Sequence, residues 1–225
     1  MNGCLTWGVF PRRWKVGNVI TIPKGPDRDR SSPKSYRPIC LLSMVGKLLE
    51  RLMATRMATI FHTHEMSSDR QYGFRPKRAM VCAIIKFREK VEQMSDKKHV
   101  LAIALDISGA FDNAWWPNVM HELKKRGCPK NLYRLTRNYF SDRIVQITGK
   151  NEIISKSVTK GCPQGSVLGP SFWNLIFDDL LAELTTSAVE CEPIAYADDI
   201  VILVAGNARI ELQQKGPGVV TRVST

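Results

Sequence analysis

The sequence predicts a mixed α+β fold, because apolar runs of strand length are interspersed with segments of helical periodicity. Residues 16–23, 100–108 and 194–205 are predominantly apolar over the length of one or two strands. Elsewhere apolar residues recur at helical spacing, most clearly over residues 43–61. With 225 residues, of which 44% are hydrophobic, the chain is long enough for one core or for two lobes that share a core.

The elements follow one another in a clear order along the chain. The strand over 16–23 precedes a loop over 24–38 that is rich in charge, serine and proline, and then the helix over 43–61. A second helix over about 78–93 precedes the strand that ends on Asp106. Two short helices follow, over 118–127 and 131–140, and Gly127 and Pro129 mark the break between them. Finally, 143–161 alternates around a Gly-Lys-Asn turn like a hairpin, and 166–186 is a long apolar helix before the two strands of 194–205.

The charge balance narrows the class of partner. The chain carries 33 Lys and Arg against 21 Asp and Glu, a net charge of +12. These basic residues are spread from Arg12 to Arg222, which favours a polyanion such as nucleic acid as the partner. A generic cationic surface, or a fragment that lacks an acidic part, stays open as an alternative.

The six cysteines show no CxxC spacing and no zinc pattern with histidine. We interpret His62 and His64, the closest histidine pair, as solvated residues rather than metal ligands. The sequence has neither the apolar core of a signal peptide nor a run of transmembrane length. We therefore expect a soluble intracellular protein with reduced thiols and no membrane partner.

Three aspartates stand where strand-like runs end or meet. Asp106 ends the run LAIALD, whereas Asp198 and Asp199 interrupt the run IAYADDIVIL. Adjacent strands could bring all three carboxylates to one rim of a sheet, where such oxygen ligands select Mg²⁺ or Mn²⁺. Two such ions, about 3.5–4 Å apart, catalyse in-line phosphoryl transfer. The alternative is a surface hairpin whose Asp-Asp pair only forms the turn.

Six stretches of the chain are together similar to one known family. They are WKVGNVITIPK, SYRPICLLSMVGKLLERLMATR, QYGFRPKRA, ALDISGAFDNAWWP, GCPQGSVLGPSFWNLIFDDLL and YADDIVIL. In this order they resemble the reverse transcriptase domain of non-LTR (LINE-type) retrotransposons, most closely those of arthropods. The resemblance extends from about residue 5 to about residue 214.

The resemblance implies a right-hand polymerase fold made of fingers and palm. The palm is expected to be an antiparallel sheet of the split β-α-β type, with helices packed on one face. The fingers would be formed by residues 1–78 and 115–158, and the palm by residues 79–114 and 159–225.

The resemblance also implies RNA-templated addition of deoxynucleotides (dNTPs) to the 3′ end of a DNA primer. Asp106 and Asp198 would bridge two Mg²⁺ ions, for which Mn²⁺ could substitute. Asp199 would stand beside them, and the carbonyl group of Ile107 would be a further metal ligand.

Four residues match the nucleotide-binding positions of the family. Lys24 and Arg37 would grip the triphosphate, where positive charge stabilises the transition state. The ring of Phe111 would collide with a 2′-hydroxyl and so favour deoxynucleotides. Gln164 would contact the nucleotide or the template backbone.

Further residues are candidates for contacts with nucleic acid or for the core. Gly165 would let the nucleic-acid backbone approach closely. Arg75, Lys77 and Arg78 would touch template or primer phosphates, although a solvated surface explains these three equally well. We predict that Trp115 and Trp116 pack in the core rather than stack on bases. The same prediction applies to the apolar stripe of Trp173, Leu175, Ile176 and Phe177.

Two other functions compete with this interpretation. In an RNA-dependent RNA polymerase the position of Phe111 is typically aspartate, and Ser-Gly replaces Pro-Gln-Gly. Because this chain has phenylalanine and Pro-Gln-Gly, both features argue against such an enzyme. The chain could also be an inactive nucleic-acid-binding remnant, because it resembles a domain clipped at both ends and without a thumb. We expect Gly-Pro-Gly at 216–218 to break the last helix, and we assign Lys215 no role as a catalytic acid. The rest of a retrotransposon polyprotein, including an endonuclease, a thumb and C-terminal regions, would be a partner.

Overall fold

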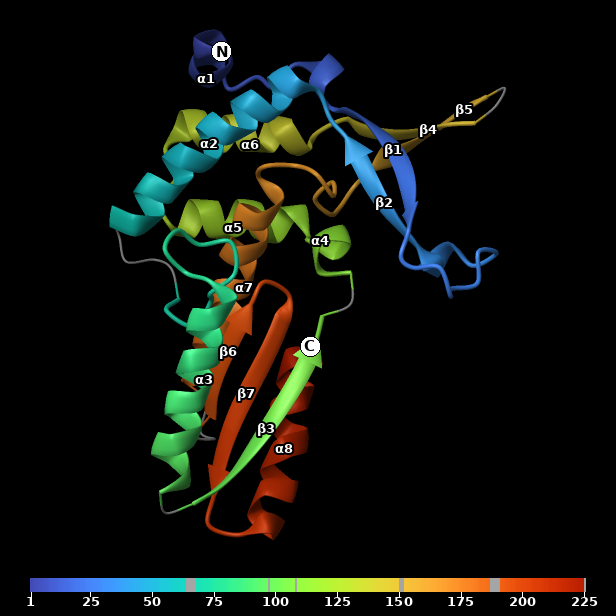
Figure 1. Ribbon diagram of the computed structural model, residues 1–225. Helices are drawn as coiled ribbons and strands as arrows, with labels where there is room; N and C mark the ends of the chain where they lie inside the picture. Colours follow the sequence, from blue (N-terminus) through green and yellow to red (C-terminus); the bar gives the residue numbers. More distant parts are fainter. Residues whose placement is uncertain (64–67, 97, 108, 150–151, 187–190, 225) are drawn as a thin grey trace. The chain divides into compact units, whose positions relative to one another are not determined.

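The computed structural model of the chain describes residues 1–63, 68–96, 98–107, 109–149, 152–186 and 191–224 (Figure 1). The chain forms two compact units, and each unit combines two separate stretches of sequence. The first unit comprises Met1–Met66 with Phe111–Phe172, and the second comprises Ser67–Ala110 with Trp173–Thr225. These boundaries differ from those of the expected lobes, whose assignment as fingers and palm stays a prediction.

The first unit contains a mixed sheet and several helices. Its elements are α1 (Asn2–Trp7), η1 (Arg12–Trp14), β1 (Val16–Pro23), η2 (Pro33–Ser35), β2 (Tyr36–Leu41), α2 (Met44–Thr63), α5 (Trp116–Lys125), α6 (Lys130–Phe140), β4 (Arg143–Thr148) and β5 (Ile153–Val158). Most of the short helix α4 (Ala110–Asn113) and the start of α7 (Gly169–Thr185) also belong to it.

The sheet of the first unit has the strand order β2-β1-β4-β5. β1 is antiparallel to β2 and parallel to β4, and β4 and β5 form an antiparallel hairpin (Figure 1). The predicted strand over 16–23 and the predicted hairpin are therefore confirmed, while Lys150 and Asn151 of its turn lie outside the described residues. β2 begins inside the predicted loop, because Tyr36 and Arg37 pair with the end of β1. A local excess of charge and proline did not reveal this pairing.

Aromatic rings dominate the core of the first unit. The rings of Phe10 and Tyr139 lie 5.1 Å apart, and those of Phe140 and Phe172 lie 5.0 Å apart. The helix α2 contributes Leu49, Met53 and Met57, which are all buried and follow one another every four residues. The predicted α2, α5, α6 and α7 are thus confirmed within a few residues at each end.

The adjacent tryptophans at the start of α5 behave differently from each other. Trp116 stacks on Phe140 at 5.0 Å, and its indole Nε1 donates to the carbonyl of Gly161 at 2.7 Å. Trp116 is half-buried, and its predicted packing against the domain is confirmed. Trp115, however, is 62% exposed, so the core prediction for this residue is wrong. Trp115 is the N-cap residue with extended backbone, and the change into helical backbone directs the two side chains apart.

The second unit contains a three-stranded antiparallel sheet with the order β3-β7-β6. Its elements are α3 (Met80–Ser95), β3 (His99–Asp106), most of α7, β6 (Cys191–Tyr196), β7 (Asp199–Gly206) and α8 (Arg209–Ser224). The predicted second helix, the strand that ends on Asp106 and the pair of strands that meet at the aspartates are confirmed.

Helices cover both faces of this sheet (Figure 1). Ala83 of α3 packs with Ile194 and Leu203, which lie on one face. On the other face, Leu101 and Ile103 of β3 lie next to Gly216 of α8. The prediction of helices on one face only is therefore wrong for α3. The strands are apolar on both faces, and each face is stabilised by covering it.

The helix α8 continues through Gly216, Pro217 and Gly218, although the sequence predicts a break there. Leu212, Gly216 and Val219 are buried, whereas Pro217 lies on the exposed side of the helix. Burial of one helix face outweighs the hydrogen bond that proline cannot make.

Among the described residues, no helix combines the length and the apolar character needed to cross a membrane. All six cysteines are free thiols.

Candidate catalytic site

The end of the sheet in the second unit brings the three predicted aspartates together. Asp106, the last residue of β3, pairs directly with Asp199, the first residue of β7. Asp198 immediately precedes β7, and its carbonyl accepts a hydrogen bond from the N–H of Ile107 at 3.4 Å. Directly opposed residues on antiparallel strands place their side chains on the same face of the sheet. Residues separated by more than 90 positions in the sequence therefore meet at one rim.

A two-residue turn, Ala197–Asp198, connects β6 to β7, because Tyr196 pairs with Asp199. Ala197 adopts φ +61°, a left-handed conformation that residues with a side chain rarely adopt. Asp198 is half-buried and Asp199 is exposed. The carboxylates thus lie at the margin of the apolar strands rather than in their interior.

The three carboxylates have no cationic partner among the residues that the structure describes. Within the described parts of the chain, no basic side chain forms an ion pair with Asp106, Asp198 or Asp199. Three like charges at one rim repel one another unless a cation is present, and carboxylate oxygens suit a hard divalent ion. The donor chemistry therefore fits magnesium. As the side chains stand, no three acidic, histidine or cysteine residues of the described chain converge on one point where a metal ion could be held. Binding would require rotation of the carboxylates, and Asp106 and Asp199 are exposed enough to rotate.

The carbonyl of Ile107, predicted as a further ligand, accepts a hydrogen bond from Ala110 at 3.2 Å. A carbonyl oxygen has two lone pairs, so it keeps one for a further interaction.

The predicted triphosphate-binding residues lie on the first unit, at one end of the β1–β2 ladder. Lys24 directly follows β1, and its N–H donates to the carbonyl of Ser35 at 2.8 Å. Arg37 of β2 pairs with Ile22 of β1. Both basic side chains are exposed, so this end of the ladder carries two available positive charges.

The loop 161–168 packs against the backbone of β2 in the same unit. The carbonyl of Gln164 accepts a hydrogen bond from the N–H of Cys40 at 2.8 Å. Gly165 has φ +110°, and a Cβ atom there would lie 2.8 Å from the carbonyl oxygen of Cys40. Only glycine fits this position. Gln164 also lines a cavity of about 220 Å³, together with Pro38, Asp112 and Lys160.

Phe111 is half-buried beside the same loop. Its carbonyl accepts a hydrogen bond from the N–H of Cys162 at 2.7 Å, and its ring borders Gly169. Burial raises the pKa of the Cys162 thiol to about 12, which keeps this thiol neutral. The stretches SYRPIC, AFDNAWW and GCPQGSVLG, widely separated in the sequence, therefore assemble into one part of the first unit.

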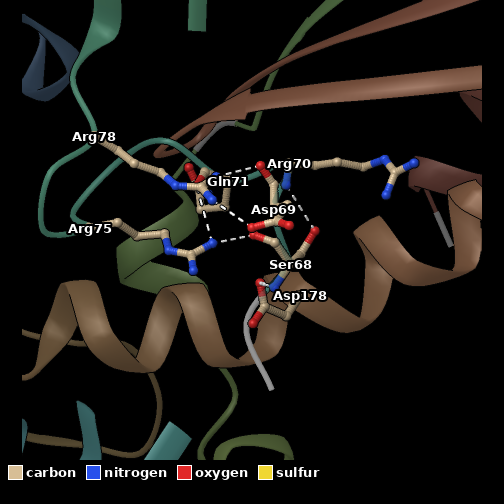
Figure 2. Close-up of polar contacts among 7 residues, drawn as sticks. All are labelled: Ser68, Asp69, Arg70, Gln71, Arg75, Arg78 and Asp178. Atoms are coloured by element: carbon tan, nitrogen blue, oxygen red, sulfur yellow. Dashed lines mark hydrogen bonds and ion pairs between the residues drawn. The ribbon is translucent and has the colours of Figure 1, made fainter. Parts of the chain in front are cut away.

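The predicted phosphate-contacting residues lie on a loop of the second unit, shown in Figure 2. Arg75 donates to the carbonyl of Ser68, and Arg78 donates to the carbonyl of Asp69 and forms an ion pair of 2.5 Å with its carboxylate. The guanidinium of Arg78 also lies 5.1 Å from the ring centre of Tyr72. These two arginines therefore hold their own loop together, whereas Lys77 is exposed. The side chains of His62 and His64 lie outside the described part of the chain.

A family model described as "Reverse transcriptase (RNA-dependent DNA polymerase)" matches residues 22–223. The chain belongs to the reverse transcriptase family.

Curated relatives of this reverse transcriptase come from insect mobile elements. The chain is 37% identical over 222 residues to the "Putative 115 kDa protein in type-1 retrotransposable element R1DM" of Drosophila melanogaster, which covers 99% of the chain and 21% of the relative. It is 36% identical to the "Retrovirus-related Pol polyprotein from type-1 retrotransposable element R1" of Bradysia coprophila, and this match covers 95% of the chain and 21% of the relative. It is 31% identical to the "RNA-directed DNA polymerase from mobile element jockey" of Drosophila melanogaster, and this match covers 90% of the chain and 22% of the relative. The predicted resemblance to reverse transcriptases of non-LTR retrotransposons of arthropods is confirmed, and the chain spans about a fifth of the length of these relatives.

Among solved structures, the fold is similar to that of a telomerase from Candida albicans in complex with a fragment of telomeric RNA. The TM-score is 0.64 at 11% identity, and the match covers 95% of this chain and 42% of the telomerase chain. An apo telomerase from Candida tropicalis gives a TM-score of 0.63 at 10% identity, and this match covers 96% of this chain and 45% of the telomerase chain. At this identity the likeness concerns the fold of the reverse transcriptase alone.

Two buried polar residues near these sites were not singled out from the sequence. Gln71 is 0% exposed beside the turn Ala197–Asp198, and Glu50 is 1% exposed beside the loop that carries Gln164. Both lie within stretches that carried the resemblance, QYGFRPKRA and the helix 43–61. Nothing in a single sequence distinguishes a buried glutamine or glutamate from a solvated one.

Proposed function

We propose that this chain carries the catalytic core of an RNA-directed DNA polymerase that extends a DNA primer on an RNA template. Membership of the reverse transcriptase family supports the reaction, and the names of several relatives support the same activity. The observation that carries the proposal is the direct pairing of Asp106 with Asp199, with Asp198 in the adjoining turn. Within the described residues the three carboxylates form no ion pair with a basic side chain, and a cation site explains this arrangement most simply.

Asp106, Asp198 and Asp199 would hold two Mg²⁺ ions, for which Mn²⁺ could substitute, and the carbonyl of Ile107 would be an additional ligand. When bound, such ions lower the pKa of an attacking hydroxyl and stabilise the charge that develops on the leaving pyrophosphate. The contribution of the protein is to keep three oxygen donors at one end of a sheet. Neutralisation by the cation would remove the repulsion between the paired carboxylates.

Four residues of the first unit would bind the incoming dNTP. Lys24 and Arg37 would bind its phosphates, since both are exposed cations at one end of the same ladder. Gln164 would contact the nucleotide or the template backbone, supported by the hydrogen bond that fixes its carbonyl on β2. Phe111 would exclude a 2′-hydroxyl through its ring.

Contacts with template or primer phosphates are proposed for Arg75, Lys77, Arg78 and Gly165. Among them Lys77 is the best placed for electrostatic attraction, because Arg75 and Arg78 already donate to carbonyls of their own loop. In a longer polyprotein of the size of the relatives, an endonuclease, a thumb and C-terminal regions would complete the binding of primer and template.

Primer extension on an RNA template, with and without Mg²⁺, tests this function. The chain should extend a DNA primer with dNTPs, and Asp198→Asn should reduce the rate by at least about 10³-fold, since removing a charge that holds the cation removes its electrostatic stabilisation. Asp96→Asn, an exposed carboxylate of the same unit, serves as the matched control and should keep the wild-type rate. Extension that survives Asp198→Asn, or that requires no divalent ion, would contradict the proposal.

Discrimination between nucleotides gives a second, independent readout. Replacement of Phe111 by alanine should relax the selectivity for dNTPs over NTPs while the Asp198 dependence remains. Wild-type extension that uses both nucleotides equally would contradict the role assigned to Phe111.

A further inference from the structure

The residue that precedes Asp198 has both of its backbone polar groups bound by side chains. The N–H of Ala197 donates to Oε1 of Gln71 at 3.0 Å, and its carbonyl accepts a hydrogen bond from Nε2 of the same side chain at 3.1 Å. The indole Nε1 of Trp173 donates to this carbonyl as well, at 3.0 Å. One amide side chain therefore binds one residue of the turn through two hydrogen bonds.

The turn requires such support because its first residue is strained. Ala197 has φ +61°, where its Cβ is too close to the following carbonyl oxygen. Glycine usually occupies such a position in a two-residue turn. Ala197 is also buried, so its N–H and carbonyl cannot be satisfied by solvent. The hydrogen bonds from Gln71 and Trp173 offset both costs.

Gln71 itself is immobilised by its surroundings. Its Oε1 accepts a second hydrogen bond, from the N–H of Gly73 at 2.8 Å. The flanking residues bind β6, since Tyr72 donates to the carbonyl of Ala195 at 2.8 Å and Ala195 donates to the carbonyl of Arg70 at 2.9 Å. A Cβ atom on Gly73 would lie 2.2 Å from the nitrogen of Ala197, so only glycine permits this close approach.

The loop that carries Gln71 is anchored in turn, as Figure 2 shows. The guanidinium groups of Arg75 and Arg78 converge on carbonyls of the loop, and each lies 3.5 Å from the carbonyl oxygen of Gln71. Ser68 donates its N–H to the carboxylate of Asp178 on α7 at 3.3 Å. Contacts therefore run without interruption from α7 through the loop to the turn of the aspartates.

We propose that Gln71 is a positioning residue that holds the turn Ala197–Asp198, and through it Asp198 and Asp199, in the arrangement that catalysis requires. Trp173 assists as the second donor to the same carbonyl. This inference rests on the proposed polymerase function, but the hydrogen bonds themselves do not depend on it. The arginines that the sequence suggested as phosphate contacts acquire a second task, which is to fix the loop of Gln71.

The decisive variant is Gln71→Met, which keeps the length of the side chain and removes both the donor and the acceptor. In primer extension, kcat should fall about 10- to 100-fold, because a buried donor and a buried acceptor lose their partner at the turn. The KM for dNTP should change less than about threefold, since the side chain of Gln71 binds Ala197 and Gly73 rather than a residue proposed to bind the nucleotide. Gln93→Met, an exposed glutamine of the same unit, is the matched control and should leave kcat unchanged.

Residue-resolved amide hydrogen exchange gives a readout that does not require activity. In Gln71→Met the N–H of Ala197 should exchange at least about tenfold faster than in the wild type, because its acceptor is gone. The amides of α8 should exchange at the wild-type rate, which would exclude general unfolding. Trp173→Phe removes the indole donor together with one ring of a buried side chain, and should give a smaller loss of kcat in the same direction. It replaces Gln71→Met if that variant does not fold.

A second substitution that restores kcat would distinguish loss of the turn's position from a general defect in the core. Adding Ala197→Gly to Gln71→Met should restore about fivefold of the lost kcat, because glycine adopts positive φ without help. A core defect would not respond to this change.

The proposal fails if Ala197 exchanges in Gln71→Met as slowly as in the wild type. It also fails if exchange accelerates while kcat stays within about twofold of the wild type. Absence of extension by the unchanged chain is a failure of the proposed function instead, and it is recognised before any variant is compared. The exchange measurement then still decides whether Gln71 holds the turn.

Discussion

The carboxylate of Glu50 accepts a hydrogen bond of 2.7 Å from the backbone nitrogen of Val167, a residue 117 positions away in the sequence. The same oxygen accepts a second hydrogen bond from Leu168 at 3.3 Å. Glu50 lies on α2 and is 1% exposed, so a buried carboxyl group fixes the end of the loop that carries Gln164. Removal of water raises the pKa of this carboxyl, while the two backbone donors and the nearby Arg143 act in the opposite direction.

Substitution of Glu50 should show which property of the carboxylate matters. Glu50→Ala should lower the free energy of unfolding by about 2–4 kcal/mol, since a half-buried and a buried N–H group lose their acceptor and a cavity remains. Glu50→Gln keeps an acceptor oxygen and should cost less than about 1.5 kcal/mol. Urea denaturation of the three proteins measures the difference. Equal losses for alanine and glutamine would contradict the acceptor role.

Glu50 should also make stability depend on pH. Its pKa is raised by folding above the ordinary value of 4.5, so the folded chain binds the proton more tightly than the unfolded chain does. The stabilisation from this group is complete below pH 4.5 and is lost as the pH rises through the raised value. The wild type should therefore lose stability relative to Glu50→Gln as the pH rises from 4.5 through the raised pKa of Glu50. A stability difference that stays constant over this range would show that Glu50 does not titrate within it.

The direct pairing of Asp106 with Asp199 predicts a conflict between stability and function. Like charges directly opposite each other on antiparallel strands destabilise the sheet, so Asp199→Asn should raise the free energy of unfolding by up to about 1 kcal/mol in chelator at low salt. The gain should shrink in added salt, which screens exposed charges, and in Mg²⁺. Asp27→Asn, an exposed carboxylate in a loop, is the control and should change little. A loss of stability in Asp199→Asn without metal would contradict repulsion at the pair.

Replacing glycine by alanine should have opposite effects on the free energy of unfolding at Gly165 and at Gly218. Gly165→Ala should lower the free energy of unfolding by at least about 1 kcal/mol, because the position has φ +110° and an added Cβ would meet the carbonyl of Cys40. Gly218→Ala should raise it by roughly 0.5–1 kcal/mol, since Gly218 is exposed inside α8 with open space around it. Thermal unfolding of both variants checks the signs. A stabilising Gly165→Ala would show that the loop does not need this backbone conformation.

The sequence was sufficient to predict most strands and helices because their apolar periodicity is local information. It also indicated that Asp106, Asp198 and Asp199 lie at one rim of a sheet, since they stand where apolar strand-like runs end or meet and such runs pair with each other. Only the structure gives the register, in which Asp106 opposes Asp199 rather than Asp198.

The features that could not be predicted depend on tertiary contacts. Gln71 is a polar residue in a turn-rich loop, and only its position beside Ala197 distinguishes it from a solvated one. Trp115 and Trp116 have the same local sequence context, yet one is exposed and the other packs on Phe140. In each case the neighbour that decides the role is distant in the sequence.

The helix α8 gives the sharpest test of tertiary packing against local propensity. Pro217 cannot donate a backbone hydrogen bond and its ring opposes the preceding turn, yet the helix runs from Arg209 to Ser224. Because Pro217 is exposed, Pro217→Ala should restore the hydrogen bond without disturbing the buried face, and should raise the free energy of unfolding by up to about 3 kcal/mol. Pro26→Ala, in an exposed loop, should instead be neutral or slightly destabilising, because proline there restricts the unfolded chain. Urea denaturation of both variants separates the two effects. If Pro217→Ala is no more stable than the wild type, then alanine gains no helical hydrogen bond at this position. That result would contradict a helix that is continuous through Pro217.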